Sequence, residues 1–327
     1  MQEYMTHTDQ IIDRIHTLCL RANHILIVSH KNCGDATGAL LAFSLYLSAR
    51  GVSHTIWLPA PVMNTFSFLP GAERIRHGIE VLEGDADFIV ALDASDARQA
   101  GIEHTIEAWR EKGTPIAVID HHYTNDEFGT VNWVDKNASA CCLMVYTYLK
   151  AVGEPMTPDM ATCLLTGILT DTGSFSNGAT NYEALAVASD LLACGAQLST
   201  IMNHTFRAVE DMATLRLWGK VLSKLKYHKH YGVAIACITQ DDLFECGVKE
   251  DDLEGVANIM NVVKDIRVGM VLMELSDGTI KGSLRTTRDD VDVAAIATFF
   301  GGGGHKKASG FSLKGKLLEI EEGWQVI

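Results

Sequence analysis

Several features that mark other protein classes are missing from this sequence of 327 residues. No apolar run approaches the ~18–20 residues that a membrane-spanning helix needs. The eight cysteines include no Cys-x-x-Cys pair and mostly lie in apolar stretches, which indicates reduced, buried thiols rather than disulfides or structural zinc. The first residues, MQEYMTHTDQ, lack the charged-then-apolar layout of a secretion signal. We therefore expect a cytoplasmic protein with no membrane contact.

Basic residues are also scarce, because 27 Lys and Arg stand against 41 Asp and Glu, for a net charge of −14. This balance argues against a protein that coats long nucleic acid through counterion release. A small phosphorylated substrate is still allowed, since bound metal ions can reverse the local field. The alternative that the acidity only keeps the protein soluble stays open.

Short apolar segments alternate with helical patterns in the first part of the chain. The segments HILIVSH, SHTIWLP, DFIVALD and TPIAVID are typical of strands, and ATGALLAFSLYLSARG is typical of a helix that stops at Gly51. Continuous apolar strands separated by helices predict a parallel sheet covered on both faces. In such sheets, ligands bind beyond the carboxyl ends of the strands.

The pattern changes further along the chain. It is mainly helical to about residue 226, and then the apolar segments YGVAIACI, VGMVLMEL and IKGSLRT indicate strands. With 47% hydrophobic residues, the chain can bury two cores of ordinary size. We predict an α/β protein with an N-terminal domain over residues 1–200, a helical linker over 201–225 and a smaller C-terminal α/β domain over 226–327.

Residues of the types that bind metal ions stand at the ends of four apolar segments. These residues are His30, Asp93, the triplet Asp120-His121-His122, and Asp171. A lone Asp after a strand is usually part of a turn or a helix cap, but four such ends favour one shared crevice. Carboxylates mixed with imidazoles suit Mn²⁺ or Mg²⁺, and two such ions can clamp a phosphate between them.

The triplet at 120–122 has its own geometry. Consecutive side chains of an extended segment point to opposite sides, so both histidines are not expected to bind one ion equally. One imidazole could bind a metal while the other meets the substrate phosphate, and Asp120 could orient an imidazole from behind. The alternative is a pair of structural histidines beside an aspartate cap.

The segment GGGGHKKASG at 301–310 is a second local signal. Its glycines let the backbone approach an anion, and the residues that follow could open a helix whose N-terminus favours phosphate. His305 and Lys306 could add positive charge, and Arg285, which ends the strand IKGSLRT, is a further anion-binding candidate. The alternatives are a flexible loop and an ordinary surface arginine.

In this order, the His30 segment, DASD at 93–96, DHH at 120–122, DTGSF at 171–175, SLRT at 283–286 and GGGGH at 301–305 resemble the DHH/DHHA1 phosphoesterase superfamily. The resemblance spans nearly the whole chain. Its length and layout are similar to the nano-RNase type, the oligoribonuclease and pAp phosphatase branch whose members are often labelled exopolyphosphatase-related. The resemblance implies a DHH catalytic domain followed by a DHHA1 substrate-binding domain.

The resemblance also implies a role for each matching position. Two Mn²⁺ ions, or Mg²⁺, would be held by His30, Asp35, Asp93, His121 and Asp171, with His30 on the first ion, Asp35, His121 and Asp171 on the second, and Asp93 bridging both. Asp120 and His122 would be catalytic, with Asp120 in support and His122 facing the phosphate. The substrate would be gripped by Arg285, Gly301, Gly302, Gly303, Gly304 and His305. The implied reaction is hydrolysis of short RNA, dinucleotides or adenosine 3′,5′-bisphosphate by a metal-bridged hydroxide, and relatives of this layout are often homodimers.

One motif departs from the family pattern. His-x-x-x-Asp-x-Asp-Ala-x-Gly is expected, but the chain reads HKNCGDATG from His30, one residue short and without the first aspartate. Asp35 matches the second aspartate, so the first ion loses a carboxylate, which predicts a weakened site. Cys33, Asn32 or a water could substitute, or the loop could shift. The alternatives to the nano-RNase function are a polyphosphate or pyrophosphate hydrolase, and a nucleotide-binding relative that has lost catalysis.

Overall fold

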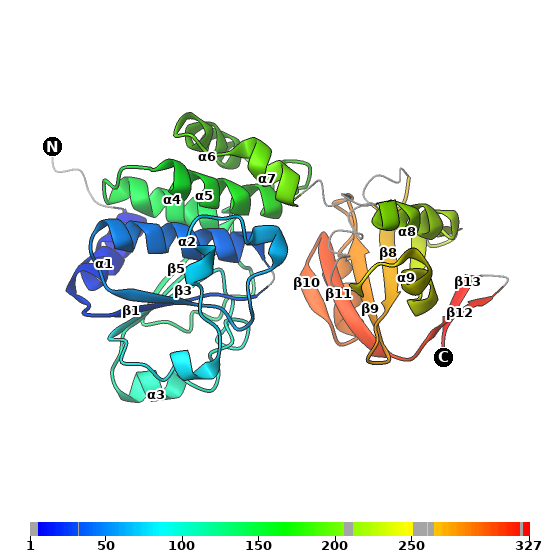
Figure 1. The fold of residues 1–327 in the computed structure, drawn as a ribbon, viewed down its shortest axis with the longest axis horizontal. Helices are drawn as coiled ribbons and strands as arrows, with labels where there is room; N and C mark the ends of the chain where they lie inside the picture. The colour runs from blue at the N-terminus through cyan, green and yellow to red at the C-terminus, as the bar shows by residue number, and fades with distance from the viewer. Residues whose placement is uncertain (1–5, 32, 206–211, 251–259, 261–264, 321–322) are drawn as a thin grey trace. The chain divides into compact units, whose positions relative to one another are not determined.

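The computed structural model describes residues 6–31, 33–205, 212–250, 260, 265–320 and 323–327 (Figure 1). The chain divides into two compact units, Met1–Ala208 and Val209–Ile327, and each is described by itself. The strands of the first unit are β1 (Ile25–Val28), β2 (His54–Trp57), β3 (Phe88–Leu92), β4 (Ile116–Asp120) and β5 (Val131–Val134). Its helices are α1 (His7–Arg21), α2 (Gly34–Ala49), α3 (Ile106–Glu111), α4 (Cys141–Ala151), α5 (Pro158–Asp171), α6 (Tyr182–Ala193) and α7 (Leu198–Thr205), and its 3₁₀ turns are Asn64–Phe66, Ala72–Arg74 and Ile79–Val81.

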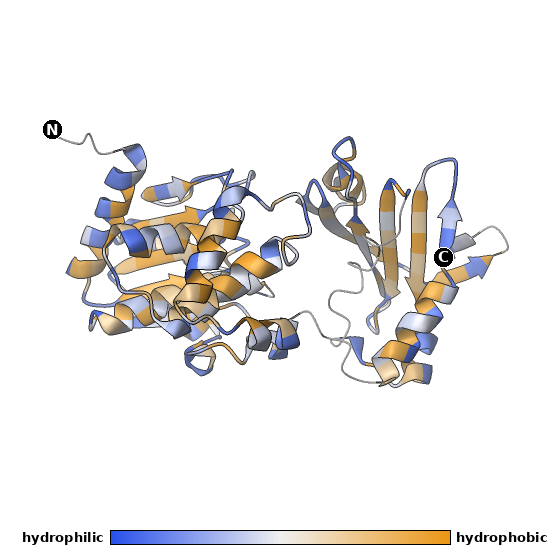
Figure 2. Ribbon diagram, turned by 90° about the horizontal axis from the view of Figure 1, so that it is seen from above, coloured by the Kyte–Doolittle hydropathy of each residue, from blue (hydrophilic) through white to orange (hydrophobic). Residues whose placement is uncertain are grey.

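The first unit is built on an all-parallel sheet in the order β2-β1-β3-β4-β5. Every residue of β1, β3 and β4 is buried, because alternate side chains pack into different cores on the two faces. Ile27, Val90 and Ile119 belong to the core that also contains α1, α2, α4 and α5. Val28 and Val118 face the opposite core, which α3 covers (Figure 1). The strands of this sheet are coloured mainly as hydrophobic in Figure 2.

Helix α2 is buried along nearly its whole length, because it lies against both the sheet and α5. Two glycines allow this close crossing. A Cβ atom on Gly38 would lie 2.4 Å from the Cys163 carbonyl oxygen, and one on Gly167 would lie 2.6 Å from Asp35 Oδ1. Within the described residues, no single helix has the length and apolar composition to cross a membrane, and only the bent pair α6 and α7 passes when taken together.

The second unit has a six-stranded sheet in the order β10-β11-β9-β8-β7-β6, in which only β7 and β8 pair in parallel. Its core on one face contains side chains of α8 and α9, and the core on the other face contains α10. The helices are α8 (Met212–Ser223), α9 (Gln240–Cys246) and α10 (Val293–Phe299). The strands are β6 (Lys226–His228), β7 (Val233–Ile238), β8 (Val268–Glu274), β9 (Thr279–Arg285), β10 (Gly303–His305) and β11 (Ala308–Lys314), with a separate hairpin of β12 (Leu317–Ile320) and β13 (Gly323–Val326).

The predicted α/β class with a parallel N-terminal sheet is confirmed, but the glycine segment is different from the prediction. Among the residues described after it, no helix begins; instead, Gly303–His305 forms strand β10, and α10 lies before the glycines. The backbone at Gly302 leaves no room for a side chain, because a Cβ there would lie 2.1 Å from the Gly310 carbonyl oxygen. Gly302 therefore allows close packing against β11. Strand β5 and helix α9 were not predicted.

Candidate metal centre

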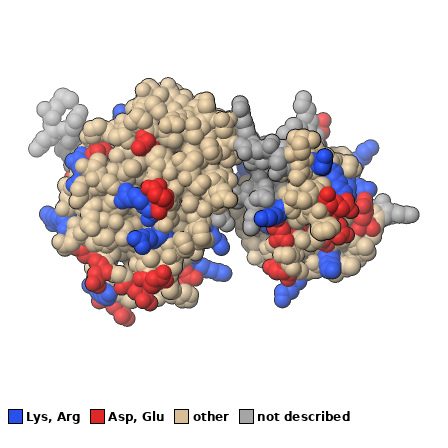
Figure 3. Space-filling model, viewed as in Figure 1, with Lys and Arg blue, Asp and Glu red and all other residues tan. Residues whose placement is uncertain are grey.

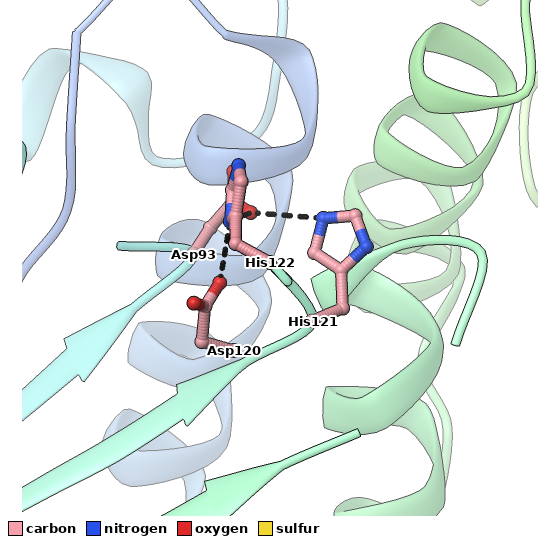
Figure 4. A group of neighbouring side chains, drawn as sticks. All are labelled: Asp93, Asp120, His121 and His122. Atoms are coloured by element: carbon pink, nitrogen blue, oxygen red, sulfur yellow. Dashed lines mark hydrogen bonds and ion pairs between the residues drawn. The ribbon is translucent and has the colours of Figure 1, made fainter. Parts of the chain in front are cut away.

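The candidate residues His30, Asp93 and Asp120-His121-His122 form a cluster beyond the carboxyl ends of three neighbouring strands, as the sequence predicts. His30 follows β1 closely, Asp93 follows β3 directly, and Asp120 ends β4 just before His121 and His122. Asp93 has a φ of 54°, in the left-handed region that a non-glycine residue rarely occupies. Strain of this kind persists where the surroundings hold a side chain in one direction, and here that direction is into the cluster (Figure 4).

Asp93 presents its two carboxylate oxygens to two different sets of groups. Oδ2 lies 3.1 Å from His30 Nε2 and 3.6 Å from Cys33 Sγ. Oδ1 lies 3.3 Å from His121 Nε2 and 3.7 Å from His122 Nδ1. Asp93 is 1% exposed, and Oδ1 makes no hydrogen bond with any described residue. A carboxylate with one oxygen towards each of two sets of groups has the arrangement of a bridging ligand.

The carboxylates around His121 come from the ends of helices α2 and α5. Asp35 lies in the first turn of α2, and Asp171 is the last residue of α5. His121 Nε2 lies 3.3 Å from Asp171 Oδ2 and 3.8 Å from Asp35 Oδ2. Groups from two helices and one strand end therefore meet around a single imidazole nitrogen.

The two histidines that face the Asp93 carboxylate through Nε2 are oriented by backbone carbonyl groups. His30 Nδ1 lies 3.0 Å from the Lys31 carbonyl oxygen, and His121 Nδ1 lies 3.2 Å from the Ala138 carbonyl oxygen. Since a carbonyl oxygen only accepts, each Nδ1 carries the proton and each Nε2 is directed at carboxylates. This is the orientation in which imidazoles bind metal ions.

Asp35 has a second role, because it caps helix α4. Its carboxylate accepts hydrogen bonds from the backbone N–H groups of Cys141, at 2.5 Å, and Cys142, at 2.8 Å. These donors belong to the first turn of α4 and have no partner within that helix. The cap fixes Asp35 at the floor of the cluster, a function that the sequence prediction missed because the donors lie more than 100 residues away.

The electrostatics of the cluster favour a bound cation. Burial, together with Asp93, raises the pKa of Asp35 to about 6, and burial with Asp35 raises that of Asp171 well above its usual range. Burial by itself lowers the pKa of His121, but Asp93, Asp171 and Asp35 outweigh it and raise the value to about 10. The raised pKa of His121 indicates that its surroundings favour positive charge at this point, and the donor set of Asp and His fits a divalent ion.

Asp120 lies behind the cluster rather than in it. Its Oδ1 accepts a hydrogen bond from His122 Nδ1 at 2.7 Å, and its Oδ2 accepts one from Asn125 Nδ2, also at 2.7 Å. Asp120 is fully buried, and its hydrogen bond with His122 holds the His122 ring in one orientation (Figure 4). The two rings are not on opposite sides, since both lie near Asp93 Oδ1, but their other partners differ: His121 meets the carboxylates of both helices, and His122 pairs with Asp120. Asn125 was not predicted and carries no sequence signal beyond its proximity to the triplet.

The predicted substrate residues of the second unit lie at one end of its sheet. Arg285 ends β9, where it pairs with Ala308 of β11, and burial lowers its pKa. His305 ends β10 and is exposed. Gly301 has a φ of 76° with open space beside it, so there the glycine is required by the backbone conformation. Asn32 lies outside the described residues.

The sequence comparisons agree with this arrangement of domains. A model described as the DHH family, N-terminal domain, matches residues 24–168, and the DHHA1 domain matches residues 221–323. The bifunctional oligoribonuclease and PAP phosphatase NrnA of Thermus thermophilus is 32% identical over 303 residues, which cover 92% of this chain and 87% of that protein. The protein of the same name from Bacillus subtilis is 26% identical over 204 residues, or 62% of this chain and 63% of that protein.

Solved structures of similar proteins extend the comparison. An exopolyphosphatase-related protein from Bacteroides fragilis matches with a TM-score of 0.87 and 27% identity, over 97% of this chain and 95% of that one. RecJ from Thermus thermophilus, in complex with Mn²⁺, matches with a TM-score of 0.55 over 96% of this chain and 53% of that one. At 13% identity, the likeness to RecJ concerns the fold alone. The chain belongs to the DHH family of phosphoesterases, in the form that carries a C-terminal DHHA1 domain.

Proposed function

We propose that this protein is a phosphoesterase that uses two divalent metal ions, one on either side of Asp93, to hydrolyse short RNA oligonucleotides and adenosine 3′,5′-bisphosphate. The observation that carries the proposal is the division of the Asp93 carboxylate, with Oδ2 facing His30 and Oδ1 facing His121. Mn²⁺ is the expected metal, and Mg²⁺ suits the same donor types.

The residues of the chain have separate tasks in this proposal. Two bound ions would polarise the phosphoryl group and lower the pKa of the attacking water. His30 and His121 direct Nε2 at the carboxylates, because their Nδ1 atoms are held by carbonyl groups. Asp120 keeps the His122 ring in place, and His122 is proposed to meet the substrate phosphate.

Short substrates are favoured by the relatives and by the charge of the surface. The Thermus thermophilus relative carries the name of an oligoribonuclease and PAP phosphatase. An open pocket of about 460 Å³ lies beside His30 and is lined by Lys31, Asp96, Arg98 and Gln99. Lys31 and Arg98 can attract a phosphate there, although sequence reasoning singled out neither. Over each unit, basic and acidic side chains are interspersed on the face in Figure 3, which suits a short ligand better than a long polyanion.

A second candidate is hydrolysis of polyphosphate or pyrophosphate. It is favoured by the likeness to the exopolyphosphatase-related protein of Bacteroides fragilis, which covers nearly the full length of both chains. The shortened loop after His30 favours a third candidate, a protein that binds nucleotides without turnover. The three candidates differ in whether the ligand must carry a base and in whether product accumulates.

The test is a substrate panel with metal-stripped protein to which Mn²⁺ is returned. The panel contains a 5′-phosphorylated RNA dinucleotide, adenosine 3′,5′-bisphosphate, pyrophosphate and a short polyphosphate. We expect kcat/KM to be highest for the first two compounds. A clear preference for pyrophosphate or polyphosphate would replace the proposal with the second candidate. Tight dinucleotide binding by calorimetry with no product from any compound would replace it with the third.

A further inference from the structure

Counted back from Asp35, Cys33 stands at the position of the first aspartate of the family motif, the carboxylate that this chain lacks. It is the N-cap residue of α2, with an extended backbone conformation, but its side chain makes no capping hydrogen bond. Instead, Sγ lies 3.6 Å from Asp93 Oδ2. The thiol side chain is therefore directed at the cluster rather than at the first turn of its own helix.

The spacing of the three candidate ligand atoms suits a single ion. His30 Nε2, Cys33 Sγ and one Asp93 oxygen all lie within 4.8 Å of one another. A tetrahedral ion with sulfur at about 2.3 Å and oxygen at about 2.1 Å separates those two ligands by about 3.6 Å. The distance from Cys33 Sγ to Asp93 Oδ2 is 3.6 Å. For nitrogen and oxygen ligands the same geometry gives about 3.4 Å, and the distance from His30 Nε2 to Asp93 Oδ2 is 3.1 Å.

A second observation points to a ligand at this place. Asp93 is 1% exposed and its backbone is held at a φ of 54°, so that a buried carboxylate oxygen, Oδ2, is directed at both His30 and Cys33. A buried carboxylate favours a bound cation, and an ion at Oδ2 would lie within reach of Cys33.

We propose that Cys33 is a thiolate ligand of the first metal ion, so that His30, Cys33 and Asp93 form a site of mixed nitrogen, sulfur and oxygen donors. This inference rests on the metal-dependent function proposed above. The second site, with Asp35, His121 and Asp171, contains no sulfur among the described residues. Because thiolates favour Zn²⁺ and Co²⁺ over Mn²⁺ and Mg²⁺, the two sites differ in metal preference, and the first selects the softer ion.

Cobalt spectroscopy tests the assignment without depending on activity. Metal-stripped protein is titrated with Co²⁺, and near-ultraviolet sulfur-to-cobalt charge transfer is recorded together with the visible bands of the bound ion. We expect the charge-transfer band in the unchanged chain and in a control, Cys194→Ser, which alters another partly exposed thiol of the same unit. The band should vanish in Cys33→Ser while the visible bands persist. A charge-transfer band that survives in Cys33→Ser overturns the proposal.

Two further readouts separate this inference from the proposed function. If Co²⁺ binds and the dinucleotide is cleaved but no charge-transfer band forms, the Cys33 assignment fails and the proposed function stands. If the band depends on Cys33 but no compound of the panel is cleaved, the ligand stands and the proposed function fails. Cys33→Asp should shift the ratio of Zn²⁺ to Mn²⁺ affinity by about tenfold or more towards Mn²⁺. An unchanged ratio in that variant would contradict the thiolate ligand.

Discussion

Replacing Asp171 with Asn tests the second metal site through the stability of the first unit. A ligand that binds only the folded state at a hundred times its Kd adds about 2.7 kcal/mol to the free energy of unfolding. The unit spans Met1–Ala208, a size for which 1 kcal/mol shifts the melting temperature by roughly 2–4 °C. Saturating Mn²⁺ should therefore raise the melting temperature of the unchanged chain by about 5–11 °C.

In Asp171→Asn we expect this shift to fall to less than about half, because His121 loses the carboxylate at 3.3 Å and the second ion loses a ligand. Without metal, the variant should melt at or above the temperature of the unchanged chain. Burial and Asp35 raise the pKa of Asp171, so its ionised form destabilises the metal-free fold as the pH rises to neutrality, and Asn removes that charge.

The assay is scanning calorimetry of metal-stripped protein with and without Mn²⁺. The matched control is Asp13→Asn, which removes an exposed carboxylate of α1 from the same unit and should keep the full shift. Dinucleotide turnover in Asp171→Asn should fall by at least about 100-fold. A full Mn²⁺ shift in Asp171→Asn, or no shift in the unchanged chain, would refute the second metal site.

Three other predictions concern packing, acid stability and the second unit. Gly167→Ala should destabilise the first unit by about 1–3 kcal/mol, because the new Cβ would lie 2.3 Å from Cys142 Sγ. The control is Gly219→Ala in α8, where the new Cβ meets open space. Equal melting temperatures for the two variants would argue against the close crossing of α2 and α5. Burial by itself raises the pKa of Asp242, but hydrogen bonds from Lys224, the Thr239 backbone and Lys220 lower it to about 2. About 2 kcal/mol of stability is therefore present above about pH 4 and lost as the pH falls towards 2. Asp242→Asn should abolish this pH dependence in acid unfolding. Identical acid-unfolding profiles for Asp242→Asn and the unchanged chain would contradict the prediction. Arg285→Ala should raise KM for the dinucleotide roughly tenfold or more with a smaller change in kcat, and an unchanged KM would remove Arg285 from the substrate site.

The sequence was most informative where local pattern and topology coincide. The apolar runs of β1, β3 and β4 predict a buried parallel sheet, and its topology brings His30, Asp93 and the residues after β4 to one edge. Asp171 was found by its place after an apolar segment, although that segment is helix α5 rather than a strand.

The features that the sequence did not reveal depend on contacts between distant segments. Asp35 caps α4 through Cys141, and no local pattern links these two positions. The glycines at 301–304 suggested an anion-binding helix start, but Gly302 is needed for close packing against β11. The direction of the Cys33 side chain, with Sγ 3.6 Å from Asp93 Oδ2, is likewise not determined by the motif alone, because Asp93 lies on a distant strand end.

The most direct test of the account is turnover of a 5′-phosphorylated RNA dinucleotide with Mn²⁺ by the unchanged chain and by Asp93→Asn. Among the described residues, Asp93 is the one whose carboxylate oxygens face both His30 and His121, so its loss should disturb both proposed ions at once. We predict product release by the unchanged chain, none above background in Asp93→Asn, and no loss in Asp13→Asn. Turnover in Asp93→Asn at the rate of the unchanged chain would contradict the bridged two-metal centre.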